Sequence, residues 1–468
     1  IYSWRGAEIE NILRFEKDFP GAKVIKLEQN YRSTSKILEA ASSLIKHNPT
    51  RHSKTLWTSS QEGEPIKLIS CYSDLEEARF VANSILNDIS YSKFAARDIA
   101  VLVRAGFQTR SFEEAFINSN IQYKIIGGLK FYERAEIKDV ISYLRLILNH
   151  NDDVAFERII NVPKRSIGAS TLQQIKNHSY SHNISHFNAL MQMVESKILK
   201  SKALVESENF LKLIHKFTND RILKNKPSDF ISKLVSESGY KDMLKLEKTD
   251  ESRGRLDNIN ELIRASAEYN NISEFIEHTS LVMDNDSTGE FGSEVNLMTI
   301  HAAKGLEFDC VYIPGMEEGL FPHQKSLKES GDIGIEEERR IAYVAITRAK
   351  KNLIISYTEK RRMYNEIISS VPSRFLAEIN LSIAQKNTST NYYNSIKFSQ
   401  NRSSYAISDS RFKETPKEIS DPLRPGSRVS HNSFGKGIIL KKNGDNLEIF
   451  FESSGIKTIR SSFVSPVV

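Results

Sequence analysis

The sequence has few of the features that would place it outside a reducing cytosol. Its 468 residues include only two cysteines, Cys71 and Cys310, which give neither a disulfide framework nor the spacing of a metal site. No apolar run approaches transmembrane length, and no signal peptide is visible. We therefore expect a cytoplasmic protein. Because the chain opens on Ile1 without an initiator methionine, we also expect that its true amino terminus is missing.

The sequence also lacks a strong charge imbalance. It has 65 Lys and Arg against 59 Asp and Glu, a formal net charge of +6. Residues 381–468 hold 13 basic and 7 acidic side chains, which leaves 52 of each in the rest of the chain. The excess therefore lies in the tail, where it permits nucleic-acid binding without proving it. The length and the 39% of hydrophobic residues indicate an ordinary globular protein of about three domains.

The stretch 295–356 carries the clearest pattern of secondary structure. Apolar, β-branched runs at 295–300, 310–314 and 353–356 predict three strands, and a helix is predicted over 336–351. This order favours an α/β fold with a largely parallel sheet, whose functional groups collect where strands pass into loops and helices.

On the predicted helix, Arg348 continues an apolar stripe formed by Ile341, Val344 and Ala345. An arginine in that position should be partly buried. Because burying an unpaired guanidinium is costly, Arg348 must meet an anion. That anion is either a carboxylate of this chain or the phosphate of a ligand.

Two other segments combine aromatic and arginine side chains. Tyr2, Trp4 and Arg5 precede a predicted helix and suit stacking against unpaired bases, although Trp4 alone could be a core residue. Tyr31 and Arg32 follow a predicted strand at 24–27 and suit a nucleotide, with the ring on the base and the guanidinium at a phosphate. A helix is predicted after each of these segments. The buried face of the first helix is predicted to contain Ile9, Ile12, Leu13 and Phe19. The second helix, which Ser33 or Thr34 can cap, is predicted to bury Ile37, Leu38, Ala41, Leu44 and Ile45.

These segments resemble known motifs in a known order. IYSWRGA, LEQNYRST, MTIHAAKGLEFDCV and EEERRIAYVAITRAKKNL are similar to the third to sixth helicase motifs of the UvrD/PcrA/Rep family of superfamily-1 DNA helicases. Connecting stretches such as DIAVLVRAGFQTRSFEEAF are similar too, so the resemblance covers roughly residues 1–380. It implies an α/β fold with a RecA-like P-loop NTPase-type domain, a large helical insertion and a small carboxy-terminal SH3- or Tudor-like β-barrel.

The resemblance and the composition together predict a domain order. Residues 1–24 are expected to end a first RecA-like domain, and 25–131 together with 291–380 to form a second one, with a helical insertion at 132–290. Residues 381–423, rich in Ser, Asn, Tyr and Lys, are expected to be a flexible linker. Residues 424–468 are expected to form the barrel, with short β runs and a hairpin turn at Asn443-Gly444.

The resemblance implies an ATP site. Tyr31 would stack on the adenine, Glu307 would hydrogen-bond the ribose, and Arg32 and Arg348 would reach the γ-phosphate as the catalytic arginines. Two guanidinium groups suit phosphoryl transfer, because they stabilise charge that spreads over the phosphate oxygens. The cofactors implied are ATP and Mg²⁺, with the Mg²⁺ ligands expected amino-terminal to Ile1.

The resemblance also implies contacts with single-stranded DNA and with junctions of single and double strands. Tyr2 and Trp4 would stack on bases, and Arg5 would link that loop to the nucleotide. His301 and Arg104 would meet the DNA strand, although His301 could equally be a loop hydrogen-bond donor.

Within the insertion, PKRSIGAST stands where members of the family carry a Gly-Ile-Gly turn near duplex DNA. Ser166 replaces the first glycine, and Gly168 keeps the second. Because serine adopts a positive φ less readily than glycine, we expect a turn that is harder to form.

The largest departure from the family is the lack of a G-x-x-x-x-G-K-[ST] phosphate loop and of an acidic pair before IYSWRGA. We interpret the chain as the carboxy-terminal part of a longer ATP-dependent 3′–5′ helicase of DNA repair or replication, inactive by itself. The alternative is a non-enzymatic remnant that binds DNA or a partner. A nuclease-coupled helicase of the RecB/AddA type is disfavoured, because the tail lacks a carboxylate-rich pattern. The barrel would bind RNA polymerase or a repair protein, or else DNA without specificity.

Overall fold

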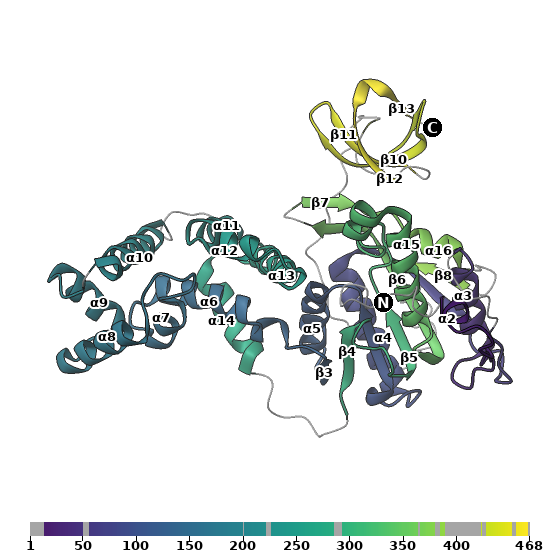
Figure 1. Ribbon diagram of the computed structural model, residues 1–468, viewed down its shortest axis with the longest axis horizontal. Coiled ribbons are helices and arrows are strands. Elements are labelled where there is room, and N and C mark those ends of the chain that lie inside the picture. Colours follow the sequence, from purple (N-terminus) through teal and green to yellow (C-terminus); the bar gives the residue numbers. More distant parts are fainter. Residues whose placement is uncertain are drawn as a thin grey trace, which may run out of the picture. The chain divides into compact units, whose positions relative to one another are not determined.

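The computed structural model describes residues 14–49, 56–199, 201–220, 226–284, 293–363, 366–379, 384–388, 423, 427–451 and 455–466. The chain separates into two compact units (Figure 1). One unit, here the sheet unit, combines Ile1–Gly127 with Phe291–Val468, and the other, the helical unit, is Gly128–Glu290. The helical unit therefore begins slightly before the insertion predicted at 132–290.

The sheet unit is built on a largely parallel sheet, which confirms the predicted α/β class. Its strands run in the order β3-β4-β2-β5-β6-β1-β8, all in parallel pairs, and β7 pairs with β6 in the antiparallel sense. The strands are β1 (Ile66–Ser73), β2 (Ile99–Val103), β3 (Tyr123–Ile126), β4 (Val295–Thr299), β5 (Phe308–Ile313), β6 (Ala349–Met363), β7 (Glu366–Ser369) and β8 (Ala384–Thr388).

Helices cover both faces of this sheet, because its strands are apolar on both sides. On β2, for example, Ala100 and Leu102 face one layer, while Ile99, Val101 and Val103 face the other. The first layer contains α3 (Ser35–Ile45), α15 (Gln324–Ile346) and α16 (Arg374–Glu378), and the second contains α4 (Asp74–Ser90) and α5 (Thr109–Asn118). Of the predicted face of α3, all but Ile45 is fully buried, and Thr34 is its N-cap residue without a side-chain cap bond.

The observed helix α15 differs at both ends from the helix predicted over 336–351. Helix α15 starts earlier and folds back at Gly331, whose φ of 50° and ψ of −127° are not helical. The fold-back brings the Ser326 carbonyl oxygen within 2.1 Å of where a Cβ on Gly334 would stand, so only glycine fits there. At its other end the helix stops at Ile346, because Ala349 already pairs with Phe308 as the start of β6. The third predicted strand, 353–356, is therefore only the central part of β6.

The amino-terminal segment also differs from the prediction. Residues 24–27 were predicted as a strand, but they form no regular element, and Val24, Ile25 and Leu27 are exposed. Helix α2 is confined to Phe15–Asp18, and Phe19, predicted to be buried, is exposed. Ile9, Ile12 and Leu13 lie outside the described residues.

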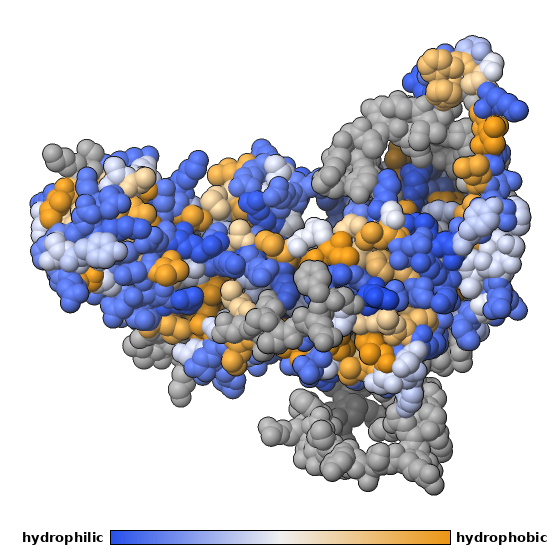
Figure 2. All heavy atoms as spheres, turned by 90° about the horizontal axis from the view of Figure 1, so that it is seen from below, coloured by the Kyte–Doolittle hydropathy of each residue, from blue (hydrophilic) through white to orange (hydrophobic). Residues whose placement is uncertain are grey.

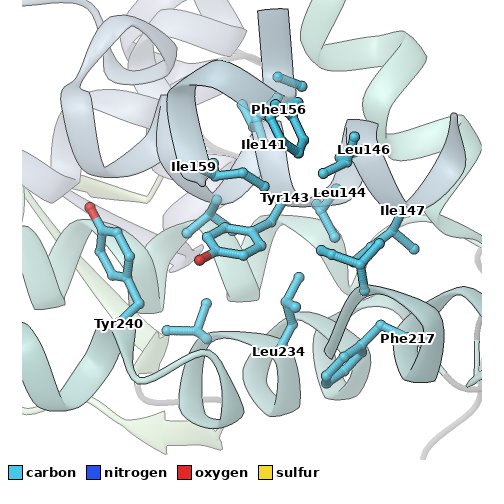
Figure 3. Packing of buried hydrophobic residues seen from close by; sticks show 14 of the residues in the cluster. Ile141, Tyr143, Leu144, Leu146, Ile147, Phe156, Ile159, Phe217, Leu234 and Tyr240 are labelled. Atoms are coloured by element: carbon cyan, nitrogen blue, oxygen red, sulfur yellow. The ribbon is translucent and has the colours of Figure 1, made fainter. Parts of the chain in front are cut away.

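The helical unit has its own hydrophobic core. Its helices are α6 (Ala135–Leu148), α7 (Asp153–Ile159), α8 (Ala169–His182), α9 (His186–Glu195), α10 (Ser201–Asp220), α11 (Pro227–Glu237), α12 (Tyr240–Glu247), α13 (Asp250–Ser266) and α14 (Ile272–Asp284). Figure 3 shows the ring of Tyr143 lying among the aliphatic side chains of this core. Most of the outer face visible in Figure 2 is hydrophilic, with hydrophobic side chains scattered in small groups. None of the described helices of the chain combines the length and apolar character needed to cross a lipid bilayer.

A second, antiparallel sheet lies at the carboxy-terminal end of the chain. Its strands follow the order β12-β11-β10-β9-β13 and are β9 (Arg428–His431), β10 (Gly435–Asn443), β11 (Asn446–Phe451), β12 (Gly455–Arg460) and β13 (Val464–Pro466). The hairpin predicted at Asn443-Gly444 turns one residue later, on Gly444 and Asp445, because Asn443 pairs with Asn446. Residues 381–423 were predicted as a flexible linker, but β8 within them pairs with β1 through its backbone.

A buried ion network fastens the long strand β6 to its neighbours. Arg361 lies 2.6 Å from Glu77 of α4 and 2.7 Å from Glu317. The two carboxylates also accept hydrogen bonds from the backbone of Gly315 and Thr358, so the remaining lone pairs have partners. The guanidinium is only 6% exposed.

Replacing Arg361 by Met should strongly destabilise the sheet, because two buried carboxylates lose their counter-ion at a cost of about 3–5 kcal/mol. Hydrogen–deuterium exchange of β1 and β6 should become about a hundredfold faster or more. Lys360, its neighbour on β6, contacts the exposed Tyr72, and Lys360→Met should change exchange only slightly. Equal exchange in the two variants would contradict the role given to the network.

Candidate functional site

Four charged side chains gather where β5 and β6 begin, at the amino edge of the sheet. Glu307 immediately precedes β5, and Arg348 immediately precedes β6. The pairing of Phe308 with Ala349 places these two positions side by side, and the Phe308 amide donates to the Arg348 carbonyl at 3.0 Å. The other two side chains are Arg32, from the turn before α3, and Lys350, on β6 itself.

Arg348 is half-buried, as predicted, and neutral oxygens accept its hydrogen bonds. Its Nε donates to the Val344 carbonyl at 3.1 Å, its Nη1 to the Leu306 carbonyl at 2.9 Å, and its Nη2 to the Thr347 hydroxyl at 3.2 Å. In the part of the chain that the structure describes, no carboxylate oxygen lies within ion-pair distance of Arg348. Burial and the neighbouring Arg32 cation lower the pKa of Arg348 from its ordinary value. The guanidinium is therefore a fixed positive charge beside a second one.

Arg32 shares a carboxylate with Lys350. Its Nε donates to Glu307 Oε2 at 2.6 Å, and Lys350 Nζ lies 2.9 Å from the other oxygen, Oε1. The hydrogen bonds from Arg32 and Lys350 hold the pKa of Glu307 below its usual value. Arg32 Nη1 also donates to the Thr347 carbonyl at 3.3 Å, so this guanidinium and that of Arg348 contact the same residue.

Tyr31 stands beside these charges with its ring exposed. The side chain is 79% accessible, and its hydroxyl donates to Gln29 Oε1 at 2.7 Å. Asn30 shapes the turn, because its side-chain oxygen accepts from the backbone amides of Arg32 and Ser33. An exposed aromatic face next to two guanidinium groups is a suitable surface for a base linked to phosphates.

The structure thus brings together four residues predicted for the nucleotide: Tyr31, Arg32, Glu307 and Arg348. It adds Lys350 and Asn30, which sequence reasoning missed. Lys350 was overlooked because the helix was predicted to continue to 351, whereas the residue lies on β6. The Asn-x-x-Ser spacing of Asn30 and Ser33 could have indicated the turn.

Arg104 and His301 lie at the opposite, carboxyl edge of the sheet, after β2 and β4. Arg104 is engaged by a carboxylate: its Nε donates to Glu338 Oε2 at 2.9 Å and its Nη2 to Oε1 at 2.5 Å. This bidentate pair occupies part of the fork that was predicted for DNA. Glu338 was missed because 234 residues separate the partners in sequence.

Glu338 joins several segments at this edge. It also accepts from the His323 amide at 3.1 Å and from the Ser326 hydroxyl at 2.8 Å. Burial alone would raise the pKa of Glu338, but hydrogen bonds from Arg104 and Ser326 lower it. An ionised Glu338 therefore holds the fold-back of α15 and Arg104 together.

His301 is half-buried in the same region. Burial and the neighbouring Arg104 cation lower its pKa from 6.5 to about 4, so the ring is neutral at physiological pH. A neutral imidazole can still donate one hydrogen bond. His301 therefore offers polarity, and no formal charge, to whatever lies at this edge.

One loop connects the two edges. Because β4 and β5 both run parallel to β2, residues 300–307 must cross from the carboxyl edge to the amino edge. His301 stands near the start of this loop and Glu307 at its end. Ala303, between them, is buried against the first helical layer.

In the helical unit, Ser166 adopts the left-handed backbone that we expected it to resist. Its φ is 58°, and Gly168 serves as the N-cap of α8 with a φ of −84°. Buried Arg165 supports this turn by donating to the carbonyl oxygens of Ile159 and Ile160. The turn thus forms with a serine in the left-handed region, and the expectation that serine makes it harder to form than glycine stays a prediction. Both Ser166 and Gly168 are exposed.

The remaining predicted residues, Tyr2, Trp4 and Arg5, lie outside the described residues. Within the described part, no group of three or more His, Cys, Asp or Glu side chains is placed to hold a metal ion.

Comparison with known proteins identifies relatives of the chain. A family model described as the UvrD-like helicase C-terminal domain matches residues 25–360. DNA helicase II of Rickettsia typhi is 55% identical over 398 residues, which are 84% of this chain and 60% of that protein. The ATP-dependent DNA helicase PcrA of Staphylococcus aureus is 40% identical over 476 residues, which are 99% of this chain and 64% of that protein. The chain thus spans about three fifths of the length of these curated relatives.

A solved structure, the C-terminal domain of a possible DNA helicase from Lactobacillus, aligns at 9% identity with a TM-score of 0.31, over 76% of this chain and 99% of that one. A likeness at this level does not establish a shared fold.

The neutral state of His301 can be tested by NMR titration of its imidazole. We expect a midpoint near 4, far below the ordinary 6.5, and a free energy of unfolding that decreases as the pH falls from 6.5 to 4. The sign follows because the unfolded chain takes up the proton first. Arg104→Met should raise the midpoint, because a cation is removed while Glu338 remains. A midpoint near 6.5 in the unaltered chain would contradict the burial of the ring.

Proposed function

The chain belongs to the UvrD-like helicase family, which confirms the resemblance of its motifs. On that premise we propose that it is part of an ATP-dependent 3′–5′ DNA helicase or translocase that acts in DNA repair or replication. The observation that carries the proposal is the state of Arg348. A half-buried guanidinium is held in place by neutral acceptors beside a second guanidinium, an arrangement suited to an anionic ligand such as the γ-phosphate of ATP.

A purely structural role for Arg348 is the competing interpretation. Arg165 shows that this protein can bury a guanidinium on neutral acceptors for structure alone, since it also donates to backbone carbonyls and to the Tyr143 hydroxyl. Arg165 is enclosed by aromatic rings, however, whereas Arg348 is only half-buried and lies next to Arg32, whose charge disfavours its own. Placing two like charges together is costly unless an anion joins them.

The proposed roles are those that the family resemblance implies. Tyr31 would stack on the adenine, Arg32 and Arg348 would bind the γ-phosphate, and Glu307 would accept from the ribose. During phosphoryl transfer the two rigid guanidinium groups would stabilise charge on the phosphate oxygens without moving. Mg²⁺, held by groups outside the described residues, would screen the phosphate charge.

For DNA we propose the carboxyl edge of the sheet unit, with His301 as a neutral donor. Arg104 would contact a DNA phosphate only through the part of its fork that Glu338 leaves available. Tyr2, Trp4 and Arg5 would supply base stacking and the link to the nucleotide. In the helical unit, the turn of Ser166 and Gly168 would approach duplex DNA, a role compatible with their exposure.

The carboxy-terminal antiparallel sheet is proposed as the Tudor-like barrel that docks a partner such as RNA polymerase or a repair protein. A non-enzymatic remnant that binds DNA or a partner is the second candidate function for these 468 residues. It is favoured by one observation, the lack of a phosphate loop in the sequence.

The first experiment is DNA-stimulated ATP hydrolysis by a protein that also contains the residues encoded upstream of Ile1. Arg348→Ala should lower turnover by about 10³-fold, because the charge that stabilises the transition state is lost. Arg348→Lys should remain strongly impaired, since an ammonium cannot reproduce the fixed fork.

The matched control is Arg340→Ala. Arg340 lies on α15, which ends two residues before Arg348, and it pairs with Glu336 at 2.7 Å, so its loss should leave turnover within about a factor of three. A folded parent protein without turnover would overturn the enzymatic proposal in favour of the binding remnant. Equal losses in the Arg340 and Arg348 variants would show that Arg348 acts only through structure.

A further inference from the structure

Glu307 presents a conflict at the amino edge of the sheet. Its carboxylate takes the Nε of Arg32 at 2.6 Å, although Arg32 is also one of the two groups proposed for the phosphate. A polyphosphate that reached Arg32 and Arg348 would compete with Glu307 for the same guanidinium. It would also stand next to a carboxylate of the same sign of charge, and at short range this repulsion is unfavourable even though the Glu307 side chain is 42% exposed to water.

Lys350 is placed to resolve this conflict. Its ammonium lies 2.9 Å from Oε1 of Glu307, the oxygen that Arg32 does not use. Its backbone is tied to the segment that carries Arg32, because the Lys350 carbonyl accepts from the Thr34 amide at 3.1 Å and the Ala349 carbonyl from the Ser33 hydroxyl at 2.6 Å. Lys350 can therefore retain Glu307 when Arg32 turns to another anion.

We propose that Lys350 is a positioning residue of the nucleotide site, which holds Glu307 away from the phosphates and keeps its charge compensated while Arg32 and Arg348 bind them. This inference rests on the proposed ATP site and adds a residue to it. Of the four charged groups, three are cations and one is an anion, so the cluster carries a net positive charge of two. Without Lys350 that charge is halved, and Glu307 has no cation left once Arg32 is occupied.

Lys351 provides a matched control on the same strand. It pairs with Asp309 at 2.7 Å, as Lys350 pairs with Glu307, but its side chain is 63% exposed and Asp309 contacts neither arginine of the site. The two lysines thus have the same charge, adjacent positions and carboxylate partners. They differ in whether the partner also binds Arg32.

The test uses these 468 residues and inorganic tripolyphosphate, titrated at constant ionic strength so that screening does not vary. NMR of the Nε–H groups of isotope-labelled arginine reports binding, with the signals of Arg32 and Arg348 assigned by their Lys variants. Lys350→Met should weaken binding by about tenfold, because an uncompensated carboxylate remains beside the phosphates. Lys351→Met should change it by about twofold at most.

A double-mutant cycle separates positioning from direct attraction. If Lys350 acts through Glu307, then Lys350→Met should have little effect in a Glu307→Gln background, where no carboxylate needs to be held. The same tenfold loss in both backgrounds would mean that Lys350 attracts the phosphates directly, and the positioning role would be overturned. Equal tripolyphosphate affinity of the Lys350→Met and Lys351→Met variants would also overturn the positioning role, but it would leave the proposed ATP site intact.

Failure of the proposed function itself has a different signature. In that case tripolyphosphate would leave the Arg32 and Arg348 signals of the unaltered chain unmoved, and the inference about Lys350 would fall with the site. If tripolyphosphate binds to the unaltered chain and Lys350→Met specifically weakens that binding, the result supports both the proposed ATP site and the positioning role of Lys350.

Discussion

A guanidinium that leaves water needs acceptors for its hydrogen bonds, and this constraint shapes the sheet unit. Carboxylates satisfy it for four described arginines that join separate segments of the sheet unit. The pairs are Arg361 with Glu77 and Glu317, Arg104 with Glu338, Arg339 with Glu378, and Arg374 with Glu318. Arg348 differs from these arginines in the chemistry of its partners, because its hydrogen bonds go to neutral oxygens.

The two residue clusters at the two edges of the sheet differ in electrostatic character. At the carboxyl edge the ionised Glu338 offsets Arg104, and His301 is neutral, so little net charge is presented. At the amino edge Arg32 and Lys350 share the carboxylate of Glu307, and Arg348 adds a third cation that makes no ion pair with it. Under the proposed function, an anionic nucleotide would favour the amino edge, and contact with DNA at the carboxyl edge would depend more on hydrogen bonding than on charge.

The sequence alone could predict the α/β class, the parallel strands and the half-burial of Arg348, because each depends on local hydrophobic periodicity. It could not predict that Glu338 occupies Arg104, since contacts between distant segments leave no local pattern. Strand β8 was missed because its residues, AQKNT, join the sheet by backbone pairing and lack an apolar alternation. Lys350 was missed through an error in one helix end, which shows how a boundary shift of a few residues can conceal a member of a site.

The crossing loop 300–307 has a genetic consequence. His301 and Glu307 belong to different edges of the sheet, yet only five codons separate them. Recombination between related genes would almost always transfer the two together. A lineage that acquired a new version of one by recombination would thus acquire the accompanying version of the other, while Arg104 and Arg32, which are distant in sequence, could be exchanged independently.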